Sequence, residues 1–225
     1  YSGNNLNFQK QILFSKNILF IQDIDGVCIP LVKDPLAREL ESKFIYAAKS
    51  LAEEFFVLTC GEHEGHRGVN RIVERSLKST IKPKDNELYL RGLAACGVEY
   101  QDSDGETSFE GITEKELDFL SKVPSLIKPK FDLIVKNIFP ELDQEDINLH
   151  ADKSICDTRF SPTINFNSLF DLVNKDSEKR RLIQISFEKM MNEIILKAES
   201  EGLKNSFFLH ISPNLGNKNG RETIK

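Results

Sequence analysis

The sequence has no hydrophobic run long enough to cross a membrane. Its longest apolar runs, such as Ile18–Ile21 and Phe55–Leu58, are short, whereas a spanning helix needs about 20 apolar residues. It also lacks an excess of positive charge, because 30 Lys and Arg residues stand against 35 Asp and Glu residues. The formal charge of −5 argues against nonspecific nucleic-acid binding and against a basic membrane-binding face. We therefore expect neither a nucleic-acid partner nor a membrane partner.

Cysteine is scarce and widely spaced. The four cysteines form no C-x-x-C pair, and no signal peptide is recognisable. Reduced thiols and a cytoplasmic location are therefore expected. A phosphate-binding G-x-x-x-x-G-K-[ST] loop, a nucleophile elbow and a zinc finger are also missing. The segment Glu62–His66 is not an H-E-x-x-H zinc helix, because its two histidines are only three residues apart.

Short apolar runs alternate with amphipathic segments in the first hundred residues. Ile18–Gln22 and Phe55–Leu58 read as strands covered on both faces, and Leu88–Ala95 reads as a third strand. Two helices are expected between them. Their predicted buried residues are Leu40, Phe44, Ala47, Ala48 and Leu51 in the first helix, and Val69, Ile72, Val73 and Leu77 in the second. This alternation predicts an open α/β sheet with parallel strands.

The pattern changes near residue 105. Thr113 and Glu116 form a predicted capping box, and Asp176 or Ser177 begins a long helix that runs through Ser200. The predicted buried face of that helix consists of Ile183, Phe187, Met190, Met191, Ile194 and Ala198. Gly202 should end this helix, and Ser206–Ile211 reads as a strand after it. We expect an α/β domain over residues 1–108 and an α+β domain over residues 109–225.

Polar residues follow the first two predicted strands directly. Asp23 and Asp25 are two carboxylates one residue apart, where their mutual repulsion is costly near a low-dielectric interior. A divalent cation such as Mg²⁺ would offset that cost. Gly26 would let the backbone approach a phosphate, and Thr59 could donate a hydrogen bond to one. Taken separately, an acidic turn without function and a simple strand-ending turn remain open. Together these residues favour a phosphate site at the carboxyl ends of the strands.

The residues Phe20–Val27 and Phe56–Thr59 resemble the first two motifs of the haloacid dehalogenase superfamily. The resemblance implies a Rossmann-like core with an inserted α+β cap, and a Mg²⁺-dependent phosphatase. Asp23 would attack phosphorus to form an aspartyl-phosphate, and Asp25 would serve as general acid and then base. Mg²⁺ would be held by Asp23 and the backbone carbonyl of Asp25, and Thr59 would bind the phosphate.

The other residues of the predicted site come from the same two loops. Asp25, Gly26, Cys60 and Gly61 would line the phosphate together with Thr59. The loop that follows could contact the substrate through Glu62, His63 and Arg67, although a solvated loop is the alternative.

A narrower resemblance covers about residues 17–100. Ile18–Cys28, Leu31–Leu36, Leu58–His63 and Arg67–Glu74 are similar to the glucosylglycerol-phosphate phosphatases of cyanobacteria. That family removes phosphate from glucosylglycerol 3-phosphate and so makes a compatible solute under salt stress. The alternatives are a phosphatase for sucrose phosphate or mannosyl-3-phosphoglycerate, and a noncatalytic module that binds a phosphosugar.

The lysine and the acidic pair that form the third and fourth motifs of the superfamily are not recognisable in this sequence. In members with an inserted cap, both motifs follow the cap. The missing motifs lead us to expect that the chain stops inside or just after the cap, and that residues 1–225 alone have little activity. Because the sequence begins at Tyr1 rather than Met and ends at Lys225 without a natural stop signal, we expect both ends to be truncated.

Overall fold

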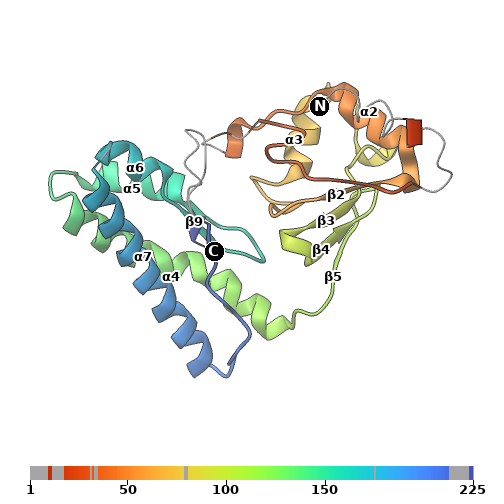
Figure 1. Ribbon diagram of the computed structural model, residues 1–225. Coiled ribbons are helices and arrows are strands. Elements are labelled where there is room, and N and C mark those ends of the chain that lie inside the picture. The colour runs from red at the N-terminus through yellow and green to blue at the C-terminus, as the bar shows by residue number, and fades with distance from the viewer. Residues whose placement is uncertain are drawn as a thin grey trace. The chain divides into compact units, whose positions relative to one another are not determined.

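The computed structural model describes residues 10–11, 18–30, 32, 35–78, 81–174, 176–212 and 223–224. The chain divides into two compact units (Figure 1). The first unit comprises Tyr1–Pro30 and Arg38–Glu110, and the second comprises Leu31–Ala37 and Gly111–Lys225. The sequence prediction places the boundary after residue 108.

A five-stranded sheet forms the centre of the first unit. Its strands, in spatial and sequence order, are β1 (Phe20–Gln22), β2 (Phe55–Leu58), β3 (Gly92–Ala94), β4 (Glu99–Gln101) and β5 (Thr107–Phe109). The strands β1, β2 and β3 are parallel, as the sequence predicts. The antiparallel strands β4 and β5 extend the sheet and were not predicted. The predicted third strand, Leu88–Ala95, is shorter than expected, since β3 covers only Gly92–Ala94. Leu88 and Leu90 are buried but lie before β3 begins.

Two helices cover one face of this sheet. Helix α2 (Ser42–Leu51) follows β1, and helix α3 (Val69–Ser76) follows β2; Figure 1 shows both on the same side of β2, β3 and β4. Four short 3₁₀ helices complete the elements of this region: η1 (Pro35–Ala37), η2 (Ala52–Glu54), η3 (Lys84–Asn86) and η4 (Ala95–Gly97). The first of these falls in the second unit.

The predicted buried face is right for α3 and partly wrong for α2. All four residues predicted for the α3 region are buried. In α2, Ala48 is buried but Ala47 is exposed, and Ile45 takes the central buried position. The buried side of α2 is centred on Ile45 and Ala48, with Phe44 and Leu51 partly buried against the same core, so Ala47 falls outside it. The core between sheet and helices contains Ile45, Phe55, Val57, Ile72 and Val73.

The second unit is built mainly from helices. Its elements are α4 (Glu114–Ile138), α5 (Gln144–Ser154), β6 (Ile155–Cys156), β7 (Thr163–Asn165), α6 (Asn167–Val173), α7 (Ser177–Ser200), β8 (Ile211–Ser212) and β9 (Thr223–Ile224). The strands form an antiparallel sheet in the order β6-β7-β9-β8. Helix α4 continues through Pro124 and Pro129.

The predicted helix ends in this unit are confirmed. Thr113 accepts a hydrogen bond from the Glu116 amide, and Glu116 accepts one from the Thr113 amide, so the capping box forms. Asp176 caps α7 by accepting from the amides of Glu178 and Lys179. Gly202, with φ of 83°, follows the helix end. The predicted strand over Ser206–Ile211 is wrong, because only Ile211 belongs to β8.

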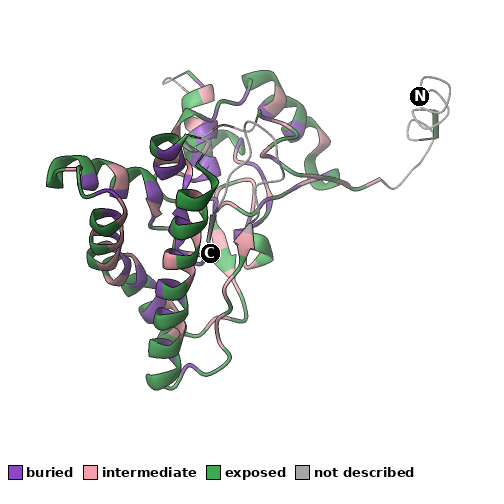
Figure 2. Cartoon of the chain, turned by 60° about the vertical axis from the view of Figure 1, so that its left-hand side comes forward, coloured by how far each residue is buried: buried purple, intermediate pink, exposed green. Residues whose placement is uncertain are grey.

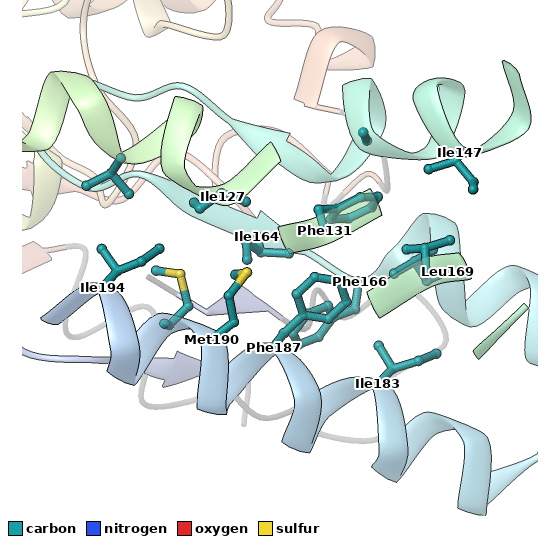
Figure 3. Packing of buried hydrophobic residues seen from close by; sticks show 14 of the residues in the cluster. Ile127, Phe131, Ile147, Ile164, Phe166, Leu169, Ile183, Phe187, Met190 and Ile194 are labelled. Carbon is teal, nitrogen blue, oxygen red and sulfur yellow. The ribbon is translucent and has the colours of Figure 1, made fainter. Parts of the chain in front are cut away.

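A continuous apolar core holds the second unit together. All six residues predicted for the buried face of α7 are buried. Phe187 packs against Phe131 at 5.2 Å and against Phe166 at 5.5 Å between ring centroids (Figure 3). The long helices carry buried residues on one side and exposed residues on the other (Figure 2). Across the residues that the structure describes, no helix is both long enough and apolar enough to cross a membrane.

Candidate functional site

The three parallel strands of the first unit are followed by polar loops at their carboxyl ends. The register aligns Gln22 with Val57 and Leu58 with Leu93, so β1, β2 and β3 end close to the same level. Asp23 follows β1, and Thr59 follows β2. Gly92, at φ of 147°, allows β3 to approach β2, since a Cβ there would lie 2.1 Å from the Val57 carbonyl oxygen. The carboxyl ends of parallel strands are where open α/β sheets bind ligands.

Local hydrogen bonds hold the loop after β1. The Ile24 amide donates to Asp23 Oδ1 at 2.8 Å, and Cys28 Sγ donates to the Asp23 carbonyl oxygen at 3.0 Å. Gly26 turns the chain at φ of 89°, and its amide donates to the Ile29 carbonyl oxygen at 2.8 Å. Asp23 and Gly26 are exposed, so both are accessible from solvent.

The thiol of Cys28 is held in its neutral form. Burial, and then the negative charge of Asp23, raise its pKa to about 11. A protonated thiol is the form that can donate to the Asp23 carbonyl. Cys28 therefore supports the turn and is not a nucleophile at neutral pH.

The loop after β2 is fixed by the strand end of β3. The Thr59 amide donates to the Leu93 carbonyl at 2.9 Å, and the Ala95 amide donates to the Gly61 carbonyl at 2.6 Å. The Gly61 amide donates to Thr59 Oγ1 at 3.2 Å. Thr59 is buried, whereas Cys60 between them is exposed. The loop thus keeps the threonine hydroxyl at a defined place beside Gly61.

Arg38 joins the two loops. Its Nη1 lies 3.1 Å from Asp25 Oδ2, and its Nη2 donates to the Arg67 carbonyl oxygen. A Cβ placed on Gly61 would lie 3.7 Å from Arg38 Nη1 and 3.7 Å from Thr59 Oγ1. The Arg38 side chain is only 4% exposed. One buried cation therefore brings Asp25, Thr59, Gly61 and the backbone of Arg67 together.

Sequence reasoning missed Arg38. No motif marks it, and its partners are 13 and 29 positions away along the chain. Arg38 and Glu39 are both charged residues between Ala37 and Leu40, and only Arg38 is buried. The sequence therefore gives no signal that distinguishes Arg38 from its exposed neighbour.

The carboxylate of Asp25 has one oxygen without a partner. Oδ2 pairs with Arg38, while buried Oδ1 has no hydrogen-bond donor among the described residues. Carboxylate oxygens suit Mg²⁺, which commonly uses one or two of them together with phosphate and water oxygens. Asp23 and Asp25 fit that small donor set. They do not make a complete protein cage, because the described ranges contain no cluster of three or more His, Cys, Asp or Glu residues suited to a metal.

The structure places the predicted substrate-contacting residues at different depths. Glu62 and His63 are buried, and their carbonyl oxygens accept from the first amides of α3, at Val69 and Asn70. Arg67 is half-buried. The fully buried His63 ring contacts the Gly92 carbonyl through Nε2 at 3.1 Å, so it does not meet a ligand that arrives from solvent in this conformation.

The environment of His63 favours its neutral form. Burial lowers the pKa of the imidazole to about 4, opposed in part by the hydrogen bond to Gly92. The His63 amide donates to Glu99 Oε2 at 2.7 Å, which ties the loop after β2 to β4. These contacts indicate that His63 supports the loop in the first unit.

The fold and the site define an α/β protein with two aspartates and a threonine at the carboxyl edge of parallel strands. The sequence profile of the glucosylglycerol-phosphate phosphatase family matches residues 17–225. The chain belongs to this family. It is 38% identical over 219 residues to a protein of Synechocystis sp. named glucosylglycerol-phosphate phosphatase, a match that covers 97% of this chain and 52% of the relative. The chain thus spans about half the length of that relative.

Proposed function

We propose that this chain contributes the nucleophile and phosphate site of a phosphatase that hydrolyses glucosylglycerol 3-phosphate. The observation that carries the proposal is the position of the Arg38 guanidinium. It pairs with Asp25, in the same loop as the exposed Asp23, and lies close to Gly61 and Thr59 in the next loop. Family membership and the name of the Synechocystis relative support the substrate. The first unit would be a haloacid dehalogenase core, and the second unit would be the cap that selects the sugar.

The reaction needs two carboxylates with different roles. Asp23 attacks phosphorus, the bond to the alcohol oxygen breaks, and Asp25 gives its proton to that oxygen. Water then attacks the aspartyl-phosphate while Asp25 takes a proton from it, which releases inorganic phosphate and restores both side chains. The Thr59 hydroxyl and the backbone beside Cys60 and Gly61 would hold the phosphate oxygens. Exposure of Asp23 fits the nucleophile, which must meet the substrate.

Asp25 fits the acid-base role by its contacts. Arg38 holds one carboxylate oxygen, which fixes the orientation of the group, and the other oxygen has no donor among the residues that the structure describes. A positioned carboxyl group with one oxygen available can pass a proton to a neighbouring alcohol or water.

Asp23 and Asp25 are also the residues that would hold Mg²⁺. When bound, the cation would neutralise charge that develops on the phosphate. A site made of the Asp23 carboxylate and the backbone carbonyl of Asp25 leaves room for phosphate and water in the coordination shell. The part of the Synechocystis relative that lies outside the match is the natural source of any further protein ligand.

The test is phosphate release in the presence of Mg²⁺, measured on residues 1–225 and on a chimera that adds the unmatched part of the Synechocystis relative. The substrates are glucosylglycerol 3-phosphate, sucrose 6-phosphate and mannosyl-3-phosphoglycerate. We expect the chimera to prefer the first, and Asp23→Asn to reduce kcat by about a thousandfold or more.

Each outcome of this experiment separates the alternatives. Preference for another sugar phosphate would retain the chemistry and reject the substrate. Binding of the phosphosugar without release, in a folded chimera, would favour the noncatalytic binding module. Robust turnover by residues 1–225 alone would contradict the expectation that this part is weakly active.

A further inference from the structure

The two loops that follow β2 and β3 each carry an exposed cysteine. Cys60 comes directly after Thr59, and Cys96 lies in the 3₁₀ turn η4, just after the end of β3. All four cysteines of the chain are thiols. Cys28 is half-buried, and Cys156 is buried in β6 of the second unit. Cys60 and Cys96 are therefore the two thiols that an oxidant in solution reaches most easily.

Backbone hydrogen bonds place these two cysteines opposite each other. The Cys96 amide donates to the Thr59 carbonyl oxygen at 3.3 Å, and that carbonyl belongs to the peptide bond between Thr59 and Cys60. The Ala95 amide donates to the Gly61 carbonyl oxygen at 2.6 Å. Because the peptide group is planar, the first of these bonds keeps the Cα atoms of Cys60 and Cys96 within about 7.5 Å of each other.

That separation is close to what a disulfide requires. A disulfide joins cysteines whose Cα atoms lie about 4.4–6.8 Å apart, so an approach of about 1 Å is enough even at the upper limit. Both cysteines lie beyond the last paired residues of the two strands, Leu58 and Leu93. Loop backbone would therefore take up the movement, and the pairing of β2 with β3 would remain.

The turn after β3 has an uncommon backbone conformation. Ala95 has φ of 49° and Cys96 has φ of 57°, both in the left-handed region that residues with a Cβ atom rarely adopt. The hydrogen bonds to Thr59 and Gly61 hold this turn against the loop after β2. Strained backbone of this kind is concentrated at functional and switching segments. A covalent change at Cys96 would therefore act directly on the loop that contains Thr59.

We propose that Cys60 and Cys96 are a redox pair, whose disulfide forms by exchange with a low-molecular-mass disulfide such as glutathione disulfide. The thiolate of one cysteine attacks glutathione disulfide and releases one glutathione; the other cysteine then attacks the mixed disulfide and releases the second. The two protein thiols are oxidised and form one S–S bond. The S–S bond of glutathione disulfide is reduced, and the two protein thiol protons pass to the two glutathione thiols.

The disulfide would act on the predicted phosphate site, a consequence that rests on the proposed function. The Gly61 amide donates to Thr59 Oγ1 at 3.2 Å, and Cys60 lies between these two residues in the chain. Drawing Cys60 toward Cys96 would move the backbone amides that the proposed function assigns to the phosphate oxygens. Oxidation should therefore weaken phosphate binding, and reduction should restore it.

The first measurement is the oxidation of residues 1–225 in buffers of glutathione and glutathione disulfide. Free thiols are blocked with iodoacetamide, and the unreduced protein is digested and analysed by mass spectrometry. We expect a cross-linked peptide pair that joins Cys60 to Cys96, with Cys28 and Cys156 recovered as blocked thiols. Dithiothreitol should remove the cross-link completely. No phosphatase assay is involved, so this result does not depend on the proposed function.

Matched variants identify the pair. Cys96→Ser removes one partner with little change in size, so Cys60 should carry a glutathione adduct and no cross-link should form. Cys156→Ala removes a buried thiol of the second unit and should leave the cross-link unchanged. In the unaltered protein, glutathione adducts without a cross-link would overturn the proposal. A cross-link that appears only in urea, or that joins two chains, would also overturn it.

The effect on phosphate release is measured separately, in the chimera that tests the proposed function. Oxidation should lower phosphate release at least about tenfold, and dithiothreitol should restore it. The chimera with Cys96→Ser should keep its activity under the same oxidising conditions. Unchanged release by a cross-linked chimera would overturn the effect on the phosphate site. A reduced chimera that releases no phosphate, while residues 1–225 form the cross-link, would reject the proposed function and retain the redox pair.

Discussion

The two units solve the problem of burying apolar surface in different ways. The second unit places its apolar residues along long helices, and the faces of α4 and α7 meet in one core with residues of α5, α6 and β7. The first unit uses strands of three or four residues, covers one face of its sheet and leaves apolar side chains on the other. The first unit also holds buried ionisable residues close to the predicted site, at Arg38, Glu62, His63 and Glu99. The comparison suggests that the second unit is stabilised chiefly by its core, whereas the first keeps polar groups and open surface for function.

The residue composition makes this comparison measurable. The chain has no tryptophan, and its four tyrosines, at positions 1, 46, 89 and 100, all belong to the first unit. Tyrosine fluorescence therefore reports unfolding of the first unit, while far-ultraviolet circular dichroism is weighted toward the long helices of the second.

The largest effect is expected from Phe131→Ala in the core of the second unit. Phe131 is fully buried against Phe187, so truncation should destabilise this unit by about 3–5 kcal/mol through lost contacts and a cavity. Urea unfolding should shift in circular dichroism but not in tyrosine fluorescence. Leu133→Ala, in the same helix at an exposed position, should change stability by less than about 0.5 kcal/mol. Equal shifts in both signals would show that the units unfold together, and would contradict the view that each unit is stabilised by its own contacts.

The second-largest effect is the pH dependence that His63 gives to the stability of the first unit. Its pKa of about 4 in the folded chain lies below the ordinary value of 6.5, so the unfolded chain binds more protons between those values. Stability of the first unit should therefore fall as pH is lowered from 6.5 to 4, by about 3 kcal/mol from this residue alone. His63→Gln should flatten that part of the pH dependence in tyrosine-monitored urea unfolding. An unchanged slope in the variant would show that other groups cause the loss.

A smaller effect is expected from Arg38→Met. Removing the guanidinium leaves the Asp25 carboxylate, whose side chain is 21% exposed, without its ion-pair partner. We expect a loss of about 2 kcal/mol in the first unit, less than for a fully buried pair because water reaches Asp25. Arg71→Met breaks an ion pair with Glu74 in which the arginine side chain is 55% exposed, and should cost less than about 1 kcal/mol. Equal losses of stability in the two variants would mean that the buried ion pair of Arg38 contributes no more than an exposed one.

The features that could be predicted from the sequence are those that depend on local patterns of residues. The six buried residues of α7 repeat at helical spacing, and the Thr113 and Asp176 caps are recognisable from residue type and position. The parallel order of β1, β2 and β3 followed from alternating strands and helices. The placement of Asp23 and Thr59 after neighbouring strands followed from the same alternation.

What the sequence did not predict depends on contacts between distant segments. Arg38 meets Asp25 only because the segment before α2 returns to the end of β1. The prediction that these strands are covered on both faces is wrong for Ile21 and Leu58, which are exposed. The run Phe55–Leu58 is apolar throughout, so the sequence does not show which of its sides faces solvent. The apolar residues Phe207–Leu209 resembled a strand, but Phe207 instead stacks on Phe119 of α4 with ring centroids 5.6 Å apart.

The smallest expected effect tests whether a change at the start of α4, like one in the core, destabilises the second unit without affecting the first. Thr113→Ala removes the cap of α4 and should cost about 1 kcal/mol in circular-dichroism unfolding, with no shift in tyrosine fluorescence. The pKa of Glu116 is lowered chiefly by the Thr113 backbone amide, which the variant keeps, and further by the Thr113 hydroxyl, which the variant removes. The stabilisation that comes from the hydroxyl is present above the ordinary carboxyl pKa and is lost as pH falls through the lowered pKa. The cost of Thr113→Ala should therefore be larger at pH 7 than at pH 3. Thr113→Ser keeps the accepting hydroxyl and should retain most of the stability, whereas an equal loss from both variants would show that the methyl group, and not the cap, is responsible.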